Sequence, residues 1–309
     1  MTVSEVPALV DRRALKLARA RSLRGGEGPD FLRRRVAEDV ADRLAATLRP
    51  FTEALDLASP GGETAAALAA RPGVRRVVRA ASLAGPGADL ACDPEALPFA
   101  PESFDLIVST LALQFANDLP GALAQVRRAL RPDGLMLAAL LGGDTLTELR
   151  QAFAAAEGEV EGGLSPRVLP FADVRALGGL LQRAGFALPV TDVDRVTVRY
   201  PHALALMADL RAWGATNALE ERRRAPLRRA TLGRMIDIYG ERFGDPDGRV
   251  RATFDIVWLS GWAPHPDQQK PLKPGSARTR LADALGVPEG APPPRPQPDK
   301  AKKEPDRDV

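Results

Sequence analysis

The order of apolar and helix-forming segments between residues 53 and 142 constrains the fold more than any other feature of this chain. Short apolar runs at EALDL, VRRVV, ADLA, FDLIVST and LMLAALL are typical of strands, and alanine-rich segments such as Leu119 to Leu130 lie between them and are typical of helices. The residues RPDG at 131–134 predict a turn by their composition. Strands that alternate with helices pair in parallel, because each crossover helix returns the chain to the same edge of the sheet. The sequence therefore predicts an α/β fold with a doubly wound, mostly parallel sheet.

The flanking segments predict the rest of the domain organisation. A helix is expected from Phe31, where apolar residues recur at nearly every fourth position, so residues 1–50 form an N-terminal helical segment before a core at 51–198. Helices within 199–249 are expected to form a lid, and a terminal strand and loop to occupy 250–280. The segment 281–309 is rich in Pro, Lys and Asp without apolar periodicity, which predicts disorder.

Composition limits the class of protein. Of the 309 residues 45% are hydrophobic, which is enough for a sizeable core, and no run of 18 apolar residues occurs. The beginning of the chain also lacks the pattern of a secretory signal, so we expect a cytoplasmic protein without an integral membrane span, either free or peripheral at the inner face of the membrane.

The supply of metal-binding side chains is small. Cys92 is the single cysteine, which excludes an internal disulfide, and beside Asp93 it is expected to be an unreactive thiol. With His202 and His265 as the two imidazoles, no structural zinc site is expected. An iron site of carboxylates and histidine stays open at this point.

Two basic stretches stand out from a net charge of only +3. Residues 11–43 hold ten Lys/Arg against six Asp/Glu, and residues 220–234 hold six against two. Such stretches are typical of solvated helix faces. If they bind a partner, an acidic protein is favoured over nucleic acid, because few aromatic residues lie among the basic ones to stack on bases.

The segment ALDLASPGGETAAAL is the predicted connection between the first core strand and the next helix. At this place an open α/β sheet receives a nucleotide, and glycines let the backbone turn with positive φ close to the ligand. Here the loop runs from Asp56 to Glu63 and includes Ala58, Pro60, Gly61 and Gly62. A Cβ at a left-handed position costs roughly 1–2 kcal/mol and Pro60 lacks an amide hydrogen, so both weaken a nucleotide site. A purely structural tight turn is the alternative.

Two acidic positions complete such a site. An acid after the second strand would accept hydrogen bonds from ribose hydroxyls, but no Asp or Glu occurs between Glu63 and Asp89. Asp93, after the third strand candidate, could accept a hydrogen bond from an adenine amino group. The alternative for Asp93 is a capping role ahead of Pro94.

The segment LLGGDTLTELR after the fifth strand candidate concentrates polar side chains. One interpretation is a capping box, in which Asp144 or Thr145 caps a helix and Glu148 reaches back to it. The other is that Asp144, Glu148 and Arg150 are catalytic, with the two carboxylates gripping a guanidinium substrate. Asp144, Glu148 and His265 could also face an iron ion, although His265 lies in a proline-rich segment typical of an exposed loop.

Trp258 and Trp262 are interpreted mainly as packing residues. A cage of aromatic rings for a cationic substrate is the alternative, because aromatic faces attract cations.

Several of these segments carry a family resemblance. CDPEALPF and SFDLIVSTLALQFANDLPGALAQVRRALRPDGLMLAALLGG resemble class I S-adenosylmethionine-dependent methyltransferases, of the branch that contains the malonyl-carrier-protein methyltransferases. GGDTLTELR, EGGLSPRVLPFADVRALGGLLQRAGF, ALMADLRAWGATNA and WLSGWAPHPDQQKPLKPGSA resemble the assembly factors of respiratory complex I, whose mitochondrial member hydroxylates an arginine of a complex I subunit. The resemblance covers residues 12–277.

The resemblance implies a methyltransferase-like Rossmann fold with S-adenosylmethionine as cofactor. It places Asp56, Ala58, Gly61 and Gly62 on the first cofactor loop, Asp93 on the adenine side and Ser109 on a strand that lines the pocket. Where the family loop reads Asp-x-Gly-x-Gly-x-Gly, this chain has Asp56, Ala58, Pro60 and Gly62, so we expect weak binding of the cofactor or none.

Three functions follow from this comparison. The first is an enzyme that hydroxylates or methylates an arginine of a complex I subunit, which would be its protein partner. The second is a non-catalytic assembly platform with a vestigial cofactor site. The third is a methyltransferase of the malonyl-carrier-protein type.

Overall fold

The computed structural model describes residues 8–25 and 28–268, and one compact unit ends at Pro266. The tail expected to be disordered, 281–309, and the end of the expected terminal loop lie outside the described residues. Within the described part of the chain, no helix has the length and apolar character needed to cross a bilayer.

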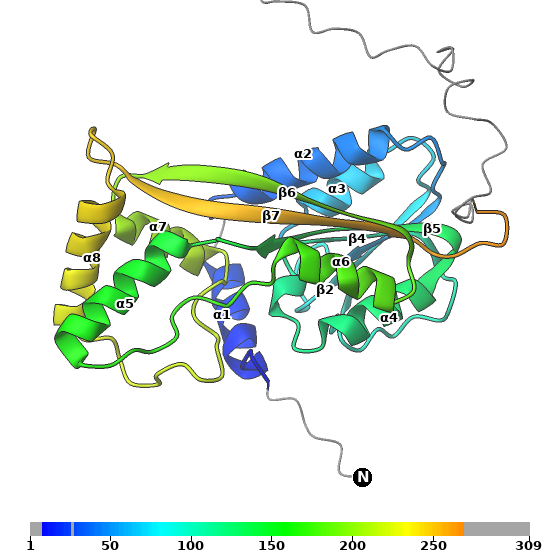
Figure 1. The fold of residues 1–309 in the computed structure, drawn as a ribbon. Helices are drawn as coiled ribbons and strands as arrows, with labels where there is room; N and C mark the ends of the chain where they lie inside the picture. Colours follow the sequence, from blue (N-terminus) through cyan, green and yellow to red (C-terminus); the bar gives the residue numbers. More distant parts are fainter. Residues whose placement is uncertain (1–7, 26–27, 269–309) are drawn as a thin grey trace, which may run out of the picture. The chain divides into compact units, whose positions relative to one another are not determined.

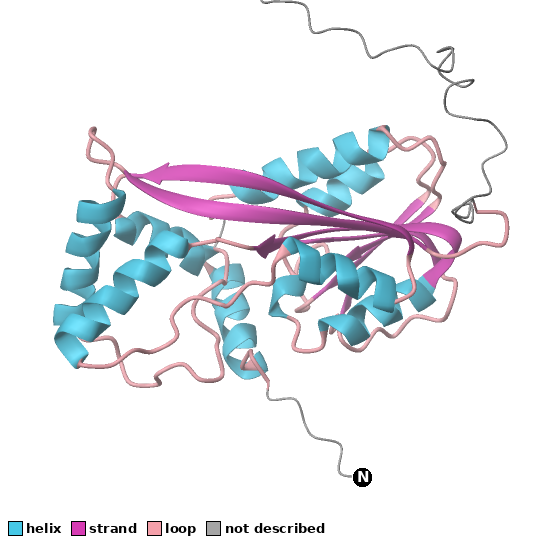
Figure 2. Cartoon of the chain, viewed as in Figure 1, coloured by secondary structure: helices cyan, strands magenta, loops and turns pink. Residues whose placement is uncertain are grey.

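The described strands form one seven-stranded sheet in the order β3-β2-β1-β4-β5-β7-β6 (Figure 2). Its parallel part consists of β1 (Glu53–Leu57), β2 (Arg76–Ala81), β3 (Leu90–Ala91), β4 (Phe104–Thr110) and β5 (Leu130–Gly142). Two long strands, β6 (Ala187–Tyr200) and β7 (Val250–Trp262), close the other edge, and β7 runs antiparallel to both of its neighbours. The predicted doubly wound, mostly parallel sheet is therefore confirmed.

Helices cover both faces of the parallel strands. Figure 1 shows α2 (Phe31–Ala45) and α3 (Glu63–Ala69) on one face, and α4 (Leu119–Ala129) and α6 (Val174–Arg183) on the other. Each face has its own cluster of buried apolar side chains. The central strands are apolar on both sides because both faces are covered; four of the five β1 residues are buried.

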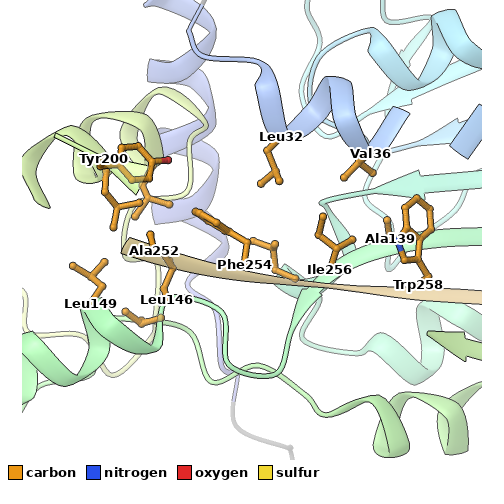
Figure 3. Close-up of a cluster of buried hydrophobic side chains, with 14 of the residues drawn as sticks. Leu32, Val36, Ala139, Leu146, Leu149, Tyr200, Ala252, Phe254, Ile256 and Trp258 are labelled. Carbon is orange, nitrogen blue, oxygen red and sulfur yellow. The ribbon is translucent and has the colours of Figure 1, made fainter. Parts of the chain in front are cut away.

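The α2-side cluster continues beneath a group of helices near the far ends of β6 and β7. This group consists of α5 (Thr147–Glu161), α7 (Ala203–Ala212) and α8 (Arg229–Phe243), and α5 packs against α8. Figure 3 shows Tyr200, Ala252 and Phe254 of the long strands with Leu146 and Leu149 in this continuous apolar layer. Helices are thus found within 199–249, where they were expected, while their role as a lid stays a prediction.

The N-terminal helix α1 (Arg12–Arg24) contacts α7. Asp11 caps α1 by accepting a hydrogen bond from the Ala14 amide at 2.9 Å, and its own amide donates to the Ala218 carbonyl at 2.8 Å. The carboxylate of Asp11 also pairs with Arg222 at 2.9 Å. These contacts join the beginning of the chain to the segment between α7 and α8.

One local prediction is wrong. The segment 131–134, expected as a turn on its Pro-Asp-Gly composition, belongs to β5, where the pairing with β4 shifts register between Phe104 and Leu106. Asp133 adopts a φ of 62° in this irregularity. The turn-forming residues therefore make a bulge inside a strand rather than a connection between elements.

Candidate functional site

A pocket of about 290 Å³ lies at the carboxyl ends of β1, β2 and β4. Residues from the first loop, from the segment after β2 and from the segment after β4 form its floor, and α1, the start of α2 and the segment after α7 form its other walls. The position agrees with the rule that ligands of open α/β sheets bind beyond the carboxyl ends of the strands.

The first loop turns with left-handed backbone positions despite its unusual residues. Ala58 has a φ of 59° and Gly61 one of 76°, so the left-handed turn expected for glycine occurs at an alanine. Ser59 accepts a hydrogen bond from the Thr110 amide at 2.9 Å, which ties the loop to the end of β4. After β4, Leu111 also has a positive φ, 50°, and lines the pocket. Strained backbone positions thus occur at the ends of two adjacent strands, where functional sites often store them.

Asp56 lies beneath this loop. It is fully buried, and neither carboxylate oxygen has a hydrogen-bond partner among the described residues. Burial raises the pKa of Asp56 to about 6, and the nearby Ser59 hydroxyl and Arg79 guanidinium oppose that rise only in part. The nearest cation is Arg79, whose Nε is 3.8 Å from the carboxylate.

Arg79 comes from β2, where it pairs in register with Asp56. Its guanidinium donates to the Pro86 carbonyl at 3.0 Å and to the Gly61 carbonyl, and so connects the first loop to the segment after β2. The side chain also lines the pocket. An arginine thus stands near the strand end where a nucleotide site of this kind usually has an acid.

Two further arginines reach the pocket from the N-terminal helices. Arg33 of α2 pairs with Glu63 at 2.9 Å. Arg19 of α1 lies over the ring of Phe115, 5.3 Å from its centre, and burial lowers the pKa of Arg19 to about 10, a shift that Asp93 opposes.

The segment after α7 closes the pocket against α1 and the α1–α2 connection. Trp213 donates its indole N–H to the Pro29 carbonyl at 2.6 Å, and the Ser22 hydroxyl donates to the Ala212 carbonyl. Gly214 has a φ of 69°, and a Cβ there would come within 3.0 Å of the Arg19 backbone. The close approach of the two segments therefore requires glycine at this position.

The predicted cofactor residues are divided between the pocket and its surroundings. Ala58 and Gly61 line the pocket and Asp56 lies under it. Gly62 is the residue that precedes α3, and Ser109 is buried in β4 with no hydrogen-bond partner for its hydroxyl among the described residues. Asp93 pairs with Arg12 at 2.7 Å and accepts from the Glu95 amide at 2.9 Å in a turn; no helix begins directly after it, so the alternative capping role is wrong. The cofactor role of all six stays a prediction.

The three predicted catalytic residues follow the carboxyl end of β5, and none of them is among the pocket's lining residues. Asp144 is exposed and pairs with Arg195 at 2.7 Å. Glu148 is buried and accepts hydrogen bonds from the Thr253 hydroxyl at 2.5 Å and the Thr253 amide at 3.1 Å. Arg150 donates to the Leu169 carbonyl at 3.2 Å. Their catalytic role stays a prediction.

The predicted capping box is wrong. Helix α5 begins at Thr147 after Leu146, which has a φ of 55°, so neither Asp144 nor Thr145 occupies the cap position. The Thr145 hydroxyl instead bonds the Gly142 and Asp255 carbonyls at 2.7 and 3.2 Å.

Asp255 of β7, rather than a helix cap, holds the segment after β5 in place by hydrogen bonds. It accepts from the Asp144 amide at 2.9 Å and from Arg195 at 2.7 and 2.8 Å. Burial opposes ionisation of Asp255, but these bonds outweigh it and hold its pKa below the ordinary value.

The iron hypothesis finds no support in this arrangement. In the part of the chain that the structure describes, no group of three or more His, Cys, Asp or Glu side chains could hold a metal ion, and this includes Asp144, Glu148 and His265. Trp258 is buried with Arg43 4.3 Å from its ring centre, and Trp262 stacks on Phe51, so both tryptophans pack in the fold.

Sequence analysis missed the three arginines that give the pocket its positive charge. Arg19 and Arg33 lie in segments that were interpreted as solvated basic surface, and Arg79 lies within a strand. One signal in the sequence could have pointed to a basic pocket: no acid directly follows β2, and an arginine, Arg79, lies within that strand.

Comparisons with known proteins agree with this geometry. Residues 54–138 match the model of a methyltransferase domain. The mitochondrial arginine-hydroxylase NDUFAF5 of Danio rerio is 40% identical over 274 residues, covering 85% of this chain and 85% of the relative, and the Homo sapiens protein of the same name is 38% identical over 263 residues, covering 82% and 76%. A malonyl-[acyl-carrier protein] O-methyltransferase of Laribacter hongkongensis is 42% identical over 183 residues, covering 59% of each chain. The identity over most of both chains shows that this protein belongs to the family of the arginine-hydroxylase NDUFAF5.

Proposed function

We propose that this chain hydroxylates an arginine side chain on a subunit of respiratory complex I during assembly of that complex. The observation that carries the proposal is the 38–40% identity to arginine-hydroxylases over more than four fifths of the chain. The identity extends beyond residues 54–138, the methyltransferase domain, into the flanking helices and the β6–β7 pair. The partner would be a protein subunit, met at the inner face of the membrane that holds the complex.

The carboxylates near the end of β5 support an interaction with arginine. Asp144 and Asp255 together already hold one guanidinium, that of Arg195, through bonds of 2.7–2.8 Å. Two carboxylates around one guanidinium make a strong, directional contact. Asp144 is exposed, so a substrate arginine could replace Arg195 at its carboxylate.

Several residues of the pocket argue against S-adenosylmethionine, the cofactor of ordinary methyltransferases, as the cofactor of the proposed reaction. S-adenosylmethionine has a net charge of about +1, from a sulfonium and an ammonium against one carboxylate, whereas Arg19, Arg33 and Arg79 line this pocket. Pro60 and the left-handed Ala58 weaken the loop further, and no acid follows β2 to accept the ribose hydroxyls. No reaction step is therefore assigned to this cofactor.

A non-catalytic assembly platform is the second candidate. The engagement of Glu148 with Thr253 and of Arg150 with Leu169 favours it, because both side chains then serve the fold. The two functions differ in whether the carboxylate of Asp144 is required: an enzyme needs it to bind the substrate arginine, whereas a platform does not.

Rescue of complex I assembly tests the proposal. The chain is expressed in cells that lack their own member of the family, and assembled complex I is measured on native gels together with NADH dehydrogenase activity. We expect the wild-type chain to restore assembly. The variant with Asp144→Asn and Glu148→Gln, which keeps both shapes, should restore assembly fully if the chain is a platform and poorly if it is an enzyme. Failure of the wild-type chain in its native host would refute both functions.

A further inference from the structure

The charges in the pocket wall are one-sided. Arg19, Arg33 and Arg79 line the pocket, and its described lining residues include no Asp or Glu. Two carboxylates lie just behind the wall: Glu63 pairs with Arg33 at 2.9 Å, and Asp56 lies 3.8 Å from Arg79. Arg19 forms no salt bridge with any described residue: it lies over the ring of Phe115, and Asp93, which pairs with Arg12, acts on it only through its charge. The pocket is therefore left with a positive charge that a ligand can neutralise.

Two buried polar atoms of the same wall have no hydrogen-bond partner within the described part of the chain, which also indicates a ligand. The Ser82 hydroxyl and the Gln114 Oε1 are buried, line the pocket and have no hydrogen-bond partner among the described residues. The amide of Gln114 is fixed by its donation to the Leu111 carbonyl at 2.9 Å, so its oxygen is held as an acceptor. Buried polar groups without partners are rare unless something absent from the structure satisfies them.

The place of these groups in the fold narrows the chemistry. In nucleotide-binding α/β sheets the residue at the end of the second strand contacts the ribose, where an acid accepts from free hydroxyls and an arginine accommodates a phosphate on the ribose. Here β2 ends at Ala81, followed by Ser82, with Arg79 just before. A guanidinium and a hydroxyl can both donate to a phosphate, and the guanidinium, unlike a carboxylate, cannot accept a hydrogen bond from a ribose diol.

The remaining wall suits a nucleoside. Leu32, Leu83, Leu141 and Trp213 supply apolar surface, and the volume of about 290 Å³ is near the lower end of the range for small-molecule sites. We propose that this pocket binds an adenine nucleotide whose ribose carries a phosphate on its 2′ or 3′ hydroxyl. Arg79, Ser82 and the unpaired Arg19 would hold the anionic part.

Two biological sources share this chemistry, and fragments of each distinguish them. Adenosine 2′,5′-bisphosphate is the phosphorylated half of NADP, and adenosine 3′,5′-bisphosphate is the corresponding half of coenzyme A. Adenosine 5′-monophosphate is the matched compound without the additional phosphate. Calorimetric titration of the full chain with all three, and with S-adenosylmethionine, measures the preference directly.

We expect one of the two bisphosphates to bind about ten- to a hundredfold more tightly than adenosine 5′-monophosphate, because charge-assisted hydrogen bonds to the phosphate are gained. Ser82→Ala, which removes one donor without changing charge, should weaken bisphosphate binding and leave that of the monophosphate unchanged. Arg19→Gln should do the same, while Arg19→Lys should retain part of the preference. Arg199→Gln on β6, where the native side chain pairs with Asp245 and Asp247, is the control for loss of a positive charge.

Thermal unfolding of each variant confirms that it is folded before titration. The proposal is overturned if the monophosphate binds as tightly as both bisphosphates, if none of the nucleotides binds, or if S-adenosylmethionine binds more tightly than either bisphosphate. The inference concerns a pocket whose lining residues do not include the carboxylates invoked for the proposed function, and it is tested by binding alone. A negative titration therefore leaves the modification of arginine to be decided separately.

Discussion

Replacement of Glu148 separates a structural role from a catalytic one. Glu148 lies near the beginning of α5, is 7% exposed, and accepts from both the amide and the hydroxyl of Thr253 on β7. Glu148→Ala leaves two partly buried donors without an acceptor, each at a cost of about 1–2 kcal/mol, so we expect the free energy of unfolding to fall by about 3 kcal/mol. For a chain of this size that corresponds to a fall in Tm of roughly 5 °C.

Glu148→Gln should cost much less. Its amide oxygen can accept from the Thr253 amide while its NH₂ group donates to the Thr253 hydroxyl, so both partners stay satisfied and about 1 kcal/mol is lost with the charge. Urea unfolding followed by tryptophan fluorescence measures both variants. Glu241→Ala, which removes an exposed partner of Arg234, is the control and should change stability by less than about 1 kcal/mol. A loss below about 1 kcal/mol for Glu148→Ala, or equal losses for Ala and Gln, would refute the assignment of this carboxylate to the α5–β7 contact.

Three further predictions concern Asp56, Ala58 and Cys92, which lie in or directly after strands of the parallel part of the sheet. Burial raises the pKa of Asp56 from 3.8 to about 6, so the folded state binds an extra proton between these values and loses stability as pH rises through them. Asp56→Asn removes that loss, so in urea titrations the stability of the variant relative to wild type should increase by about 2–3 kcal/mol from pH 4 to pH 7. A difference that does not depend on pH would contradict this. Ala58→Gly should raise the free energy of unfolding by up to about 1 kcal/mol, since it relieves a φ of 59° at the expense of backbone entropy, and a clear destabilisation would argue against that backbone conformation. Burial and the charge of Asp93 raise the pKa of Cys92 to about 11, so its thiol should react with iodoacetamide at pH 8 only when the chain unfolds. Mass spectrometry of the native and urea-treated protein measures this, and rapid alkylation of the native protein would contradict the buried position of Cys92.

The sheet could be predicted because its signals are local. Each of the strands from β1 to β5 is an apolar run next to a helix or turn signal, and the alternation itself implies parallel pairing. The helix from Phe31 followed in the same way from its spacing of apolar residues. The expected capping box failed because an alternative partner was remote in sequence: Asp255 lies 111 residues from Asp144 and takes its amide.

The pocket was harder to predict for the same reason. Its first loop was identified from the order of strand, turn and helix, and even the strained alanine was foreseen from the missing glycine. Its charge was not, because Arg19 reaches it from α1, a helix that sequence analysis treated as part of a basic surface. Whether an arginine faces water or a cavity depends on how α1 packs on α7, and no local pattern carries that information.

Tandem mass spectrometry of complex I subunits tests the central claim most directly. Subunits are purified from cells with the wild-type chain, from cells without it, and from cells that carry the variant with Asp144→Asn and Glu148→Gln. The account predicts one arginine that gains the mass of a single oxygen atom only when the wild-type chain is present. An arginine that gains a methyl group instead, or subunits that are identical with and without the chain, would contradict it.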